Sequence, residues 1–307
     1  MNRPLIFIGT TNLDIVFYSE QLPVPGQSLI GTIEEFGGGK GANQVVAAAQ
    51  LGGNPLFATM FGEDDAAHSM TQGLRDAGVN TSKIIKKPGF KSGKALIFVS
   101  SDGTNIIGID AGANEAFNAT DVKTALSDVP QDAVMVVEMG LPIEACRAAL
   151  ESKGDRFLIF NPAPVRAQLN KTECSCINII TPNETEAEQL TGIKVNSVEQ
   201  AFEAAKLLHN RGVAAVAITL GQNGVVYLDS ERQIHQNAYP VTAIDTTGAG
   251  DAFNGALAVQ IAKECNIADA LHFAVATASL SVTRKGAQQS MPTEAEVMQF
   301  LSEQGDK

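Results

Sequence analysis

Hydrophobic and polar positions alternate in blocks along this chain. Short apolar runs recur, and the segments between them carry apolar residues at helical spacing. Most of the apolar runs are continuous, which is typical of strands buried on both faces of a parallel sheet. The predicted strands span residues 5–8, 56–61, 133–137, 157–160, 177–180 and 213–219. The predicted helices span residues 42–51, 69–77, 143–153, 184–190, 198–210, 252–261 and 268–282.

This order of elements predicts an α/β fold. Strands that alternate with helices at this spacing form a central, mostly parallel sheet with helices packed on its faces. Two segments, 14–36 and 93–109, break the alternation, and the second contains Asp102-Gly103 between two β-favouring runs, typical of a hairpin. We expect one domain over residues 1–307, with the two segments paired into a small accessory sheet.

Composition excludes several classes of function. The net charge of −12 argues against a nucleic-acid or anionic membrane partner. The four cysteines lack the spacing of a metal site or a disulfide framework, so we expect them to be reduced and structural. No apolar stretch approaches the roughly 20 residues of a transmembrane helix, and the N-terminal apolar run is too short for a signal peptide. The sequence therefore predicts a cytoplasmic protein.

The segment from Asp245 to Asp251 carries the strongest candidate chemistry. Threonines and glycines open directly into a long apolar helix, and a helix N-terminus attracts anions. Gly248 and Gly250 lack a Cβ, so a phosphate can approach their backbone closely. A carboxylate repels phosphate, so Asp251 either takes a proton from an attacking hydroxyl or stabilises the helix start as an ordinary acidic residue. The segment alone leaves both interpretations open.

A glycine-rich turn, residues 37–44, precedes another predicted helix. It is not a Walker A loop, because Gly41 stands where Ser or Thr is needed. It is not a dinucleotide fingerprint either, because no strand ends before it with the required glycine spacing. Three consecutive glycines are entropically costly, so we favour a ligand-binding turn over a simple helix entry. Lys40 and Asn43 would supply its hydrogen bonds.

Polar residues also follow two of the predicted strands. Asn12 and Asp14 come after the first strand and either bind sugar hydroxyls or form a turn. Asn183 and Glu186 follow the strand at 177–180. They either cap the next helix or bind a hydrated Mg²⁺, and capping by itself explains the pattern.

Two further segments have simple structural interpretations. Residues 219–224 lie between two predicted strands, and their spacing favours a connecting loop over a nucleotide-contacting turn. Residues 279–290 end a helix with hydroxyl groups, basic residues and a glycine, which suffices as a C-cap although its carbonyls can also bind a monovalent cation.

Taken together, these motifs resemble the ribokinase-like family of carbohydrate and nucleoside kinases. The resemblance runs nearly end to end, from residues 9–14 to residues 283–288. Its most specific motifs are Gly38-Gly39-Lys40-Gly41-Ala42-Asn43-Gln44 and Asp245-Thr246-Thr247-Gly248-Ala249-Gly250-Asp251. Three more matches occur in order at 107–114, 161–164 and 180–186. The family implies a mostly parallel sheet flanked by helices, a β-strand lid over the sugar, and a homodimer formed through that lid.

The resemblance also implies roles for individual residues. Asp251 is expected as general base, with the backbone of Gly248, Ala249 and Gly250 stabilising the transferred phosphoryl group. The sugar site is expected at Asn12, Leu13, Asp14, Gly39, Lys40, Gly41, Ala42, Asn43, Gly140 and Asp251. The ATP site is expected at Asn183, Thr219, Leu220, Gly221, Gln222, Asn223, Gly224, Gly250, Asp251 and Val275. Mg²⁺ is expected near Asn183 and Glu186, largely through water, and K⁺ at Asp245, Thr247, Ser281, Arg284, Gly286 and Ser290.

One position departs from the family. Members that phosphorylate ribose carry a sugar-binding glutamate where Gly140 stands in this chain, and Glu138 lies two residues earlier. Residues i and i+2 of an extended chain share a face, so Glu138 is a candidate substitute. The leading expectation is an ATP-dependent kinase that forms D-ribose 5-phosphate. The alternatives are a kinase for 2-deoxyribose, another sugar or a nucleoside, and a sugar-binding regulator without activity, which the intact Asp251 disfavours.

Overall fold

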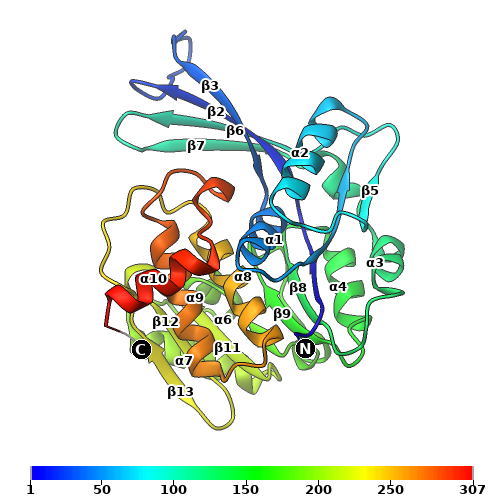
Figure 1. The fold of residues 1–307 in the computed structure, drawn as a ribbon, viewed down its shortest axis with the longest axis vertical. Helices are drawn as coiled ribbons and strands as arrows, with labels where there is room; N and C mark the ends of the chain where they lie inside the picture. The colour runs from blue at the N-terminus through cyan, green and yellow to red at the C-terminus, as the bar shows by residue number, and fades with distance from the viewer. Residues whose placement is uncertain (1, 306–307) are drawn as a thin grey trace.

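The computed structural model describes residues 2–305, and its centre is a nine-stranded sheet in the order β13-β12-β11-β10-β9-β8-β1-β4-β5 (Figure 1). In this spatial order, neighbouring strands from β11 across to β5 are parallel to one another. At the other end of the sheet, β12 is antiparallel to β11 and β13 is antiparallel to β12. This confirms the predicted α/β class. The strand bounds are β1 Leu5–Ile8, β4 Leu56–Phe61, β5 Ile84–Lys86, β8 Val134–Glu138, β9 Phe157–Asn161, β10 Ile179–Ile180, β11 Ala215–Thr219, β12 Val225–Leu228 and β13 Gln233–Gln236.

Helices cover both faces of this sheet because successive strand residues point to opposite sides. In β1, Phe7 packs into one core, whereas Ile6 and Ile8 pack into the other. The Phe7 side is covered by α1 Lys40–Gln50, α2 Asp65–Asp76, α8 Ala249–Ala262, α9 Ile267–Ser281 and α10 Glu294–Glu303. The Ile6 side is covered by α3 Ala119–Leu126, α4 Ile143–Glu151, α5 Lys171–Ser175, α6 Glu184–Thr191 and α7 Val198–Asn210. Short 3₁₀ turns occur at η1 Gly112–Ala116, η2 Gly221–Asn223 and η3 Gln288–Ser290.

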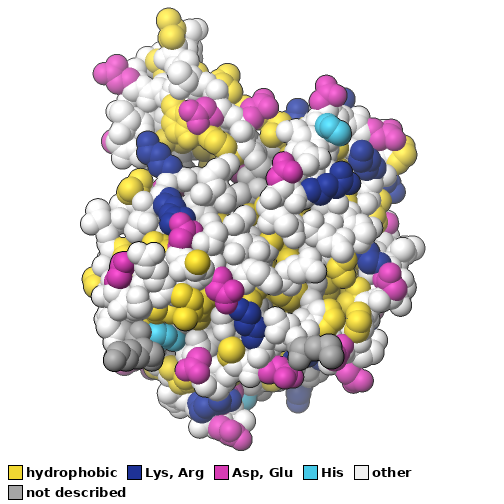
Figure 2. Space-filling view, in the orientation of Figure 1, with side chains coloured by type: hydrophobic (Ala, Val, Ile, Leu, Met, Phe, Trp, Pro, Cys, Tyr) yellow, Lys and Arg dark blue, Asp and Glu magenta, His cyan; other side chains and the backbone are white. Residues whose placement is uncertain are grey.

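The two segments that interrupt the alternation form a second, four-stranded sheet. Its order is β3-β2-β6-β7, with β2 Asn12–Ser19, β3 Thr32–Gly38, β6 Lys94–Ser100 and β7 Asn105–Asp110. This sheet projects from the main body in Figure 1. A patch of apolar side chains is visible on it in Figure 2. The exposed apolar residues of its strands include Ile33, Leu96, Ile106, Ile107 and Ile109.

The predicted strands and helices correspond to elements of the structure, and α7 has the predicted bounds. The strand predicted at 177–180 is shorter, because only β10 pairs with its neighbours there. The pattern missed α3, α5, α10 and the edge strands β5 and β13, whereas the fully buried β12 follows the turn at 219–224, as expected. Edge strands and surface helices bury only part of their length, so their apolar pattern is weak. Among the described residues all four cysteines are free, as expected, and no helix is both long and apolar enough to cross a membrane.

Candidate active site

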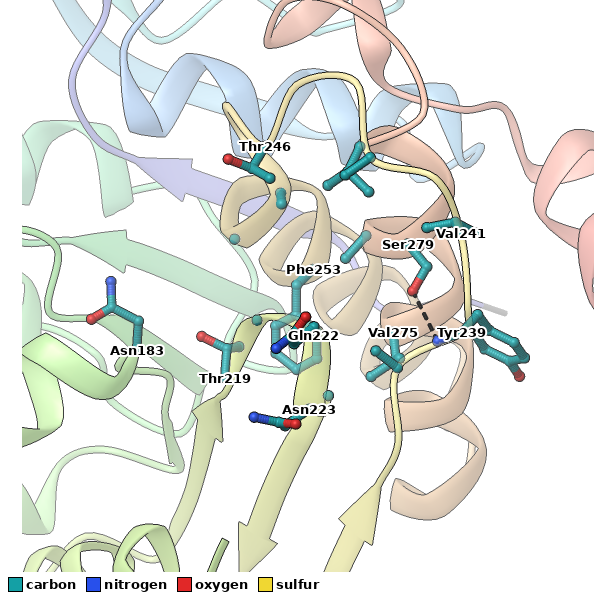
Figure 3. Close-up of a pocket in the computed structure, with 18 of the residues that line it drawn as sticks. Asn183, Thr219, Gln222, Asn223, Tyr239, Val241, Thr246, Phe253, Val275 and Ser279 are labelled. Atoms are coloured by element: carbon teal, nitrogen blue, oxygen red, sulfur yellow. Dashed lines mark hydrogen bonds between the residues drawn. The ribbon is translucent and has the colours of Figure 1, made fainter. Parts of the chain in front are cut away.

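A cavity of about 790 Å³ lies between the end of the sheet and helices α8 and α9. Figure 3 shows its lining, with Tyr239, Val241 and Val275 on one side and Asn183 and Thr219 on the other. The residues expected to bind ATP that line it are Asn183, Thr219, Gly221, Gln222, Asn223, Gly224, Gly250 and Val275. Leu220 is buried in the core beside it. The size and mixed lining are those of a cofactor pocket.

A second cavity of about 190 Å³ adjoins the first. Both cavities are lined by Asn183, Thr219, Thr246, Ala249 and Gly250, so they meet at the N-terminus of α8. The smaller one is lined in addition by groups of both charges, namely Lys40, Glu186 and Asp251, and by the amides Asn161 and Asn254. A nucleotide in the larger cavity would therefore direct its phosphates toward the smaller one.

The start of α8 is open toward the cavities. Gly248 is the N-cap and has a φ of 78°, a left-handed conformation that favours glycine. Within residues 2–305 no side chain caps this helix. The first N–H groups of a helix have no partner inside the helix, so those of α8 can face a phosphate. An alanine side chain at Gly250 would meet nothing within 4 Å, so the space beside its backbone is open.

Asp251 lies in the first turn of α8 and is only 6% exposed. Its carboxylate accepts one hydrogen bond from Asn43 Nδ2 on Oδ2 at 3.0 Å and one from Gln44 Nε2 on Oδ1 at 3.1 Å. Burial raises the pKa of Asp251, whereas the Lys40 ammonium and the two amide donors oppose that rise. In turn, Asp251 raises the pKa of Lys40, so the ammonium stays charged beside the smaller cavity. This buried, hydrogen-bonded carboxylate is equipped to accept a proton.

The glycine-rich turn allows α1 to approach the end of β1. A Cβ on Gly39 would lie 2.6 Å from Thr11 Cα, and the φ of Gly39 is 91°. A Cβ on Gly41 would lie 2.6 Å from Gly9 Cα. Only residues without a side chain permit this contact, which brings Asn43 to Asp251. The glycines therefore do more than start a helix: they let α1 pack closely enough for Asn43 to reach Asp251.

The polar groups expected to bind sugar lie at the junction of the two sheets. Asn12 begins β2, and its Oδ1 accepts a hydrogen bond from Asn114 Nδ2 at 3.1 Å. The Asp14 carboxylate lies beside Gly38, where a Cβ would come within 2.0 Å of Oδ2. Burial raises the pKa of Asp14 to about 6. Leu13 and Ala42 are buried and supply backbone and packing only.

The structure shows where Glu138 points. Its side chain is 1% exposed, and its oxygens accept hydrogen bonds from the backbone N–H groups of Thr10 and Gly140. It lines neither described cavity. A Cβ on Gly140 would lie 2.5 Å from Glu138 Oε2, so a side chain at 140 and the carboxylate of Glu138 compete for one space. Glu138 therefore connects the ends of β1 and β8 from within the protein.

Asn183 and Glu186 form a complete capping box at the start of α6. Asn183 Oδ1 accepts from Glu186 N–H at 2.9 Å, and Glu186 Oε2 accepts from Asn183 N–H at 3.0 Å. Both still line the smaller cavity. Among residues 2–305 no cluster of three or more His, Cys, Asp or Glu side chains suits a metal ion. The donor set therefore fits a Mg²⁺ held mainly by phosphates and water, not by a protein cage.

The residues expected to bind K⁺ belong to two segments that the structure brings together. Asp245 accepts from Thr247 N–H and from Gly286 N–H, each at 2.9 Å. The N–H groups of Ile244 and Asp245 both donate to Val282 O. The side chain of Arg284 forms an ion pair with Glu296, which leaves only its main-chain carbonyl for a cation.

Two serines of the same set donate their hydroxyl hydrogens to neighbouring carbonyl groups. Ser281 Oγ donates to Ala278 O at 2.9 Å, and Ser290 Oγ donates to Ala287 O at 2.8 Å, so their oxygens remain available as acceptors. Oxygen-only donors of this kind suit hard cations, a class that includes the alkali ions.

Several polar residues at the site were not assigned from the sequence. They are Gln44, Asn161, Thr181, Asn254 and Asn114. Asn161 ends the buried strand β9 and Thr181 follows the buried strand β10. This position is the one sequence signal that marks them, because ligand groups gather at the carboxyl ends of parallel strands. Gln44 and Asn254 are separated by about 200 residues of chain, and only the folded structure brings them into the same hydrogen-bond network.

The fold and the paired cavities fit the class of α/β phosphotransferases, with a large cavity that opens onto a buried carboxylate. The pattern of the pfkB family carbohydrate kinases matches residues 2–294. A ribokinase of Staphylococcus aureus is 38% identical over 306 residues, which cover 97% of this chain and 100% of that relative. A deoxyribokinase of Salmonella typhi is 35% identical over 299 residues, which cover 96% of this chain and 97% of that relative.

The likeness extends to solved structures. A ribokinase of Arabidopsis thaliana, in complex with ribose and ATP, superposes with a TM-score of 0.87 at 31% identity and covers 98% of this chain and 99% of its own. This chain belongs to the pfkB family of carbohydrate kinases. It is a sugar kinase, an enzyme that transfers a phosphoryl group to an alcohol.

Proposed function

We propose that this chain transfers the γ-phosphoryl group of ATP to the 5-hydroxyl of D-ribose, forming D-ribose 5-phosphate and ADP. The observation that carries the proposal is the position of Asp251. Its buried carboxylate lies in the first turn of the uncapped helix α8, where the two cavities meet. A hydroxyl placed there faces a base on one side and the phosphate-binding N–H groups on the other.

The chemistry follows from this placement. Asp251 removes the proton from the attacking hydroxyl, and the N–H groups at the start of α8 stabilise the charge on the phosphoryl oxygens. Lys40 adds positive charge beside them. Mg²⁺, when bound near Asn183 and Glu186, neutralises further phosphate charge. A monovalent cation held by the Asp245 and Gly286 segments would fix the same turn in place.

The acceptor is proposed to bind where the two sheets meet. Asn12, Asp14 and Asn43 supply donors and acceptors for sugar hydroxyl groups. The second sheet then acts as a lid, since it rises directly from Asn12 and carries Asp14 on its first strand. A lid that excludes water favours transfer to the sugar over hydrolysis of ATP.

A second candidate substrate is 2-deoxyribose. Gly140 supplies no side chain, and the carboxylate of Glu138 is used by two backbone N–H groups. A sugar hydroxyl on that side therefore gains no carboxylate partner, which reduces the advantage of ribose over its deoxy analogue. The deoxyribokinase among the relatives is consistent with this candidate.

A homodimer is part of the same proposal. The strands of the second sheet expose large apolar side chains, from Leu96 at 51% to Ile109 at 68%. A second copy of this lid would cover them, and closed two-fold symmetry is the commonest arrangement of such subunits. We further propose that the enzyme acts in the cytoplasm, as the sequence predicts.

The test is ADP release with Mg-ATP over ribose, 2-deoxyribose, other sugars and nucleosides, in potassium and in sodium. Asp251→Ala is expected to lose nearly all turnover while ATP still binds, because a positioned base contributes roughly 10²–10⁴-fold. More than about a tenth of the wild-type rate in that variant would contradict the role of Asp251. Turnover of a nucleoside but no pentose would reassign the acceptor.

A further inference from the structure

A buried amide lies behind the catalytic carboxylate. Gln44 belongs to α1 and is 1% exposed. Its Nε2 donates to Asp251 Oδ1 at 3.1 Å and to Asn161 Oδ1 at 3.0 Å. A primary amide has two N–H bonds, so both are used, one on the carboxylate and one on a neighbouring strand end.

The other end of this arrangement is held by further hydrogen bonds. Asn161 Nδ2 donates to Thr181 O at 2.8 Å, and Thr181 Oγ1 donates to Asn254 Oδ1 at 2.6 Å. Asn254 Nδ2 donates to Gly250 O at 2.8 Å, beside Asp251 itself. Side chains from α1, β9 and α8 and the residue after β10 thus form one buried network around the first turn of α8. Gln44 is anchored from behind and cannot turn away freely.

The orientation of Gln44 carries a cost. Within residues 2–305 its Oε1 is buried without a hydrogen-bond partner. A buried acceptor without a partner destabilises a fold. The amide nitrogen of Gln44 therefore makes two hydrogen bonds while its oxygen makes none, and this orientation costs stability. Such a cost is expected where a side chain serves function in preference to stability.

The charges that face Asp251 come from several elements. Lys40, at the start of α1, attracts the carboxylate, and Glu186, on α6, repels it. Glu138, on β8, acts on the same Lys40. Burial raises the pKa of Asp251, and the N–H groups of Asn43 and Gln44 lower it again. Of these two amides, only Gln44 lies outside the proposed sugar site.

We propose that Gln44 is a positioning residue, which orients the Asp251 carboxylate toward the acceptor hydroxyl through its hydrogen bond to Oδ1 and its anchor on Asn161. The inference rests on the proposed function. Gln44 lines neither of the two cavities, so its effect would reach the reaction only through Asp251.

The experiment compares Gln44→Met with Gln260→Met. Methionine keeps the length of the side chain and removes the amide. Gln260 is the matched control, because it is also a buried glutamine with a hydrogen bond: it is 7% exposed and accepts from Cys265. It lies at the other end of α8, away from Asp251. Steady-state kinetics are measured with the sugar that the wild type uses best, from pH 5 to pH 9, together with melting curves.

Gln44→Met is expected to lower kcat by about 10- to 100-fold, since a misplaced catalytic group costs this much. KM for ATP stays unchanged. The acid limb of kcat/KM for the sugar moves up by about one pH unit, because the carboxylate has lost a donor that favours its ionised form. Gln260→Met is expected to keep the wild-type kcat and pH profile.

A Gln44→Met profile that superimposes on the wild type, with at most a lower melting temperature, would overturn the inference. If Gln44→Met does not fold, Gln44→Glu replaces it. A carboxyl at 44 must share a proton with Asp251, so the acid limb moves up again, and an unchanged limb overturns the inference. Absence of sugar-dependent ADP release in the wild type would instead contradict the proposed function.

Discussion

The contact between Glu138 and Gly140 permits a quantitative prediction about stability. Gly140 has no left-handed φ, so Gly140→Ala introduces no backbone strain. The new Cβ would lie 2.5 Å from Glu138 Oε2, which must move away and lose its hydrogen bond from the N–H of residue 140. A hydrogen bond to a charged group contributes about 1.5–3 kcal/mol. The gain from a less flexible unfolded chain offsets about 0.4–1 kcal/mol.

We therefore expect Gly140→Ala to lower the free energy of unfolding by about 1–2 kcal/mol. In a Glu138→Ala background the carboxylate is gone and the remaining close neighbour of the new Cβ is Thr10 Cγ2 at 3.1 Å. Its methyl group has to shift only slightly, so the same change should raise the free energy of unfolding by up to about 0.4–1 kcal/mol. The two positions then show a coupling energy of about 1.5–3 kcal/mol, the size expected for residues in direct contact.

The assay is urea unfolding of the four proteins of the double-mutant cycle, with ligand-free enzyme. Gly108→Ala is the matched control, because Gly108 lies in β7 and a Cβ there would meet nothing within 4 Å. It should raise the free energy of unfolding by about 0.4–1 kcal/mol, the gain from a less flexible unfolded chain alone. An equal cost of Gly140→Ala in both backgrounds would refute the contact, and with it the explanation of why this turn carries no sugar-facing side chain.

Three further outcomes can be measured. Gly250→Ala should leave the melting temperature unchanged or raised, since a Cβ there meets nothing within 4 Å, but should raise KM for ATP or lower kcat at least about tenfold by obstructing the phosphate. KM for the sugar should rise as pH falls through about 6, where the pKa of Asp14 lies, and Asp14→Asn should abolish that dependence. Thr59→Val should leave activity intact and keep or raise stability, because Thr59 Oγ1 is buried without a partner within residues 2–305.

Each of these expectations can be contradicted by a specific result. Loss of stability in Gly250→Ala would mean that the glycine serves packing, not phosphate approach. A sugar KM that is flat from pH 5 to pH 8 would contradict the assignment of Asp14. A clear loss of stability in Thr59→Val would show that the hydroxyl has a partner.

The raised pKa of Asp14 also affects stability. Between the ordinary pKa of an aspartate and about 6, the folded state binds more protons than the unfolded state. This group by itself therefore makes the protein more stable as pH falls through about 6.

Much of the candidate site lies in short motifs that the sequence alone makes recognisable. The turn before α1 and the turn before α8 each combine glycines with a charged residue, and such local chemistry is visible in a short stretch of sequence. Asn183 and Glu186 were equally visible, and the structure shows the capping box that the spacing favours. The residues that support these groups were not visible, because their partners lie far away along the chain. Gln44 meets Asn161 and Asp251 across separations of 117 and 207 residues.

The sequence by itself determined the class of fold and marked the two glycine-containing turns, because strand burial, helical spacing and glycine content are local properties. The tertiary structure decided what those turns face. It placed Lys40 and Asp251, far apart in the chain, in one small cavity, and turned Glu138 inward onto two backbone N–H groups. The physical reason is that the pKa of a carboxylate and its access to a substrate depend on burial and on neighbouring charges and donors. Those neighbours are assembled only when helices and strands pack.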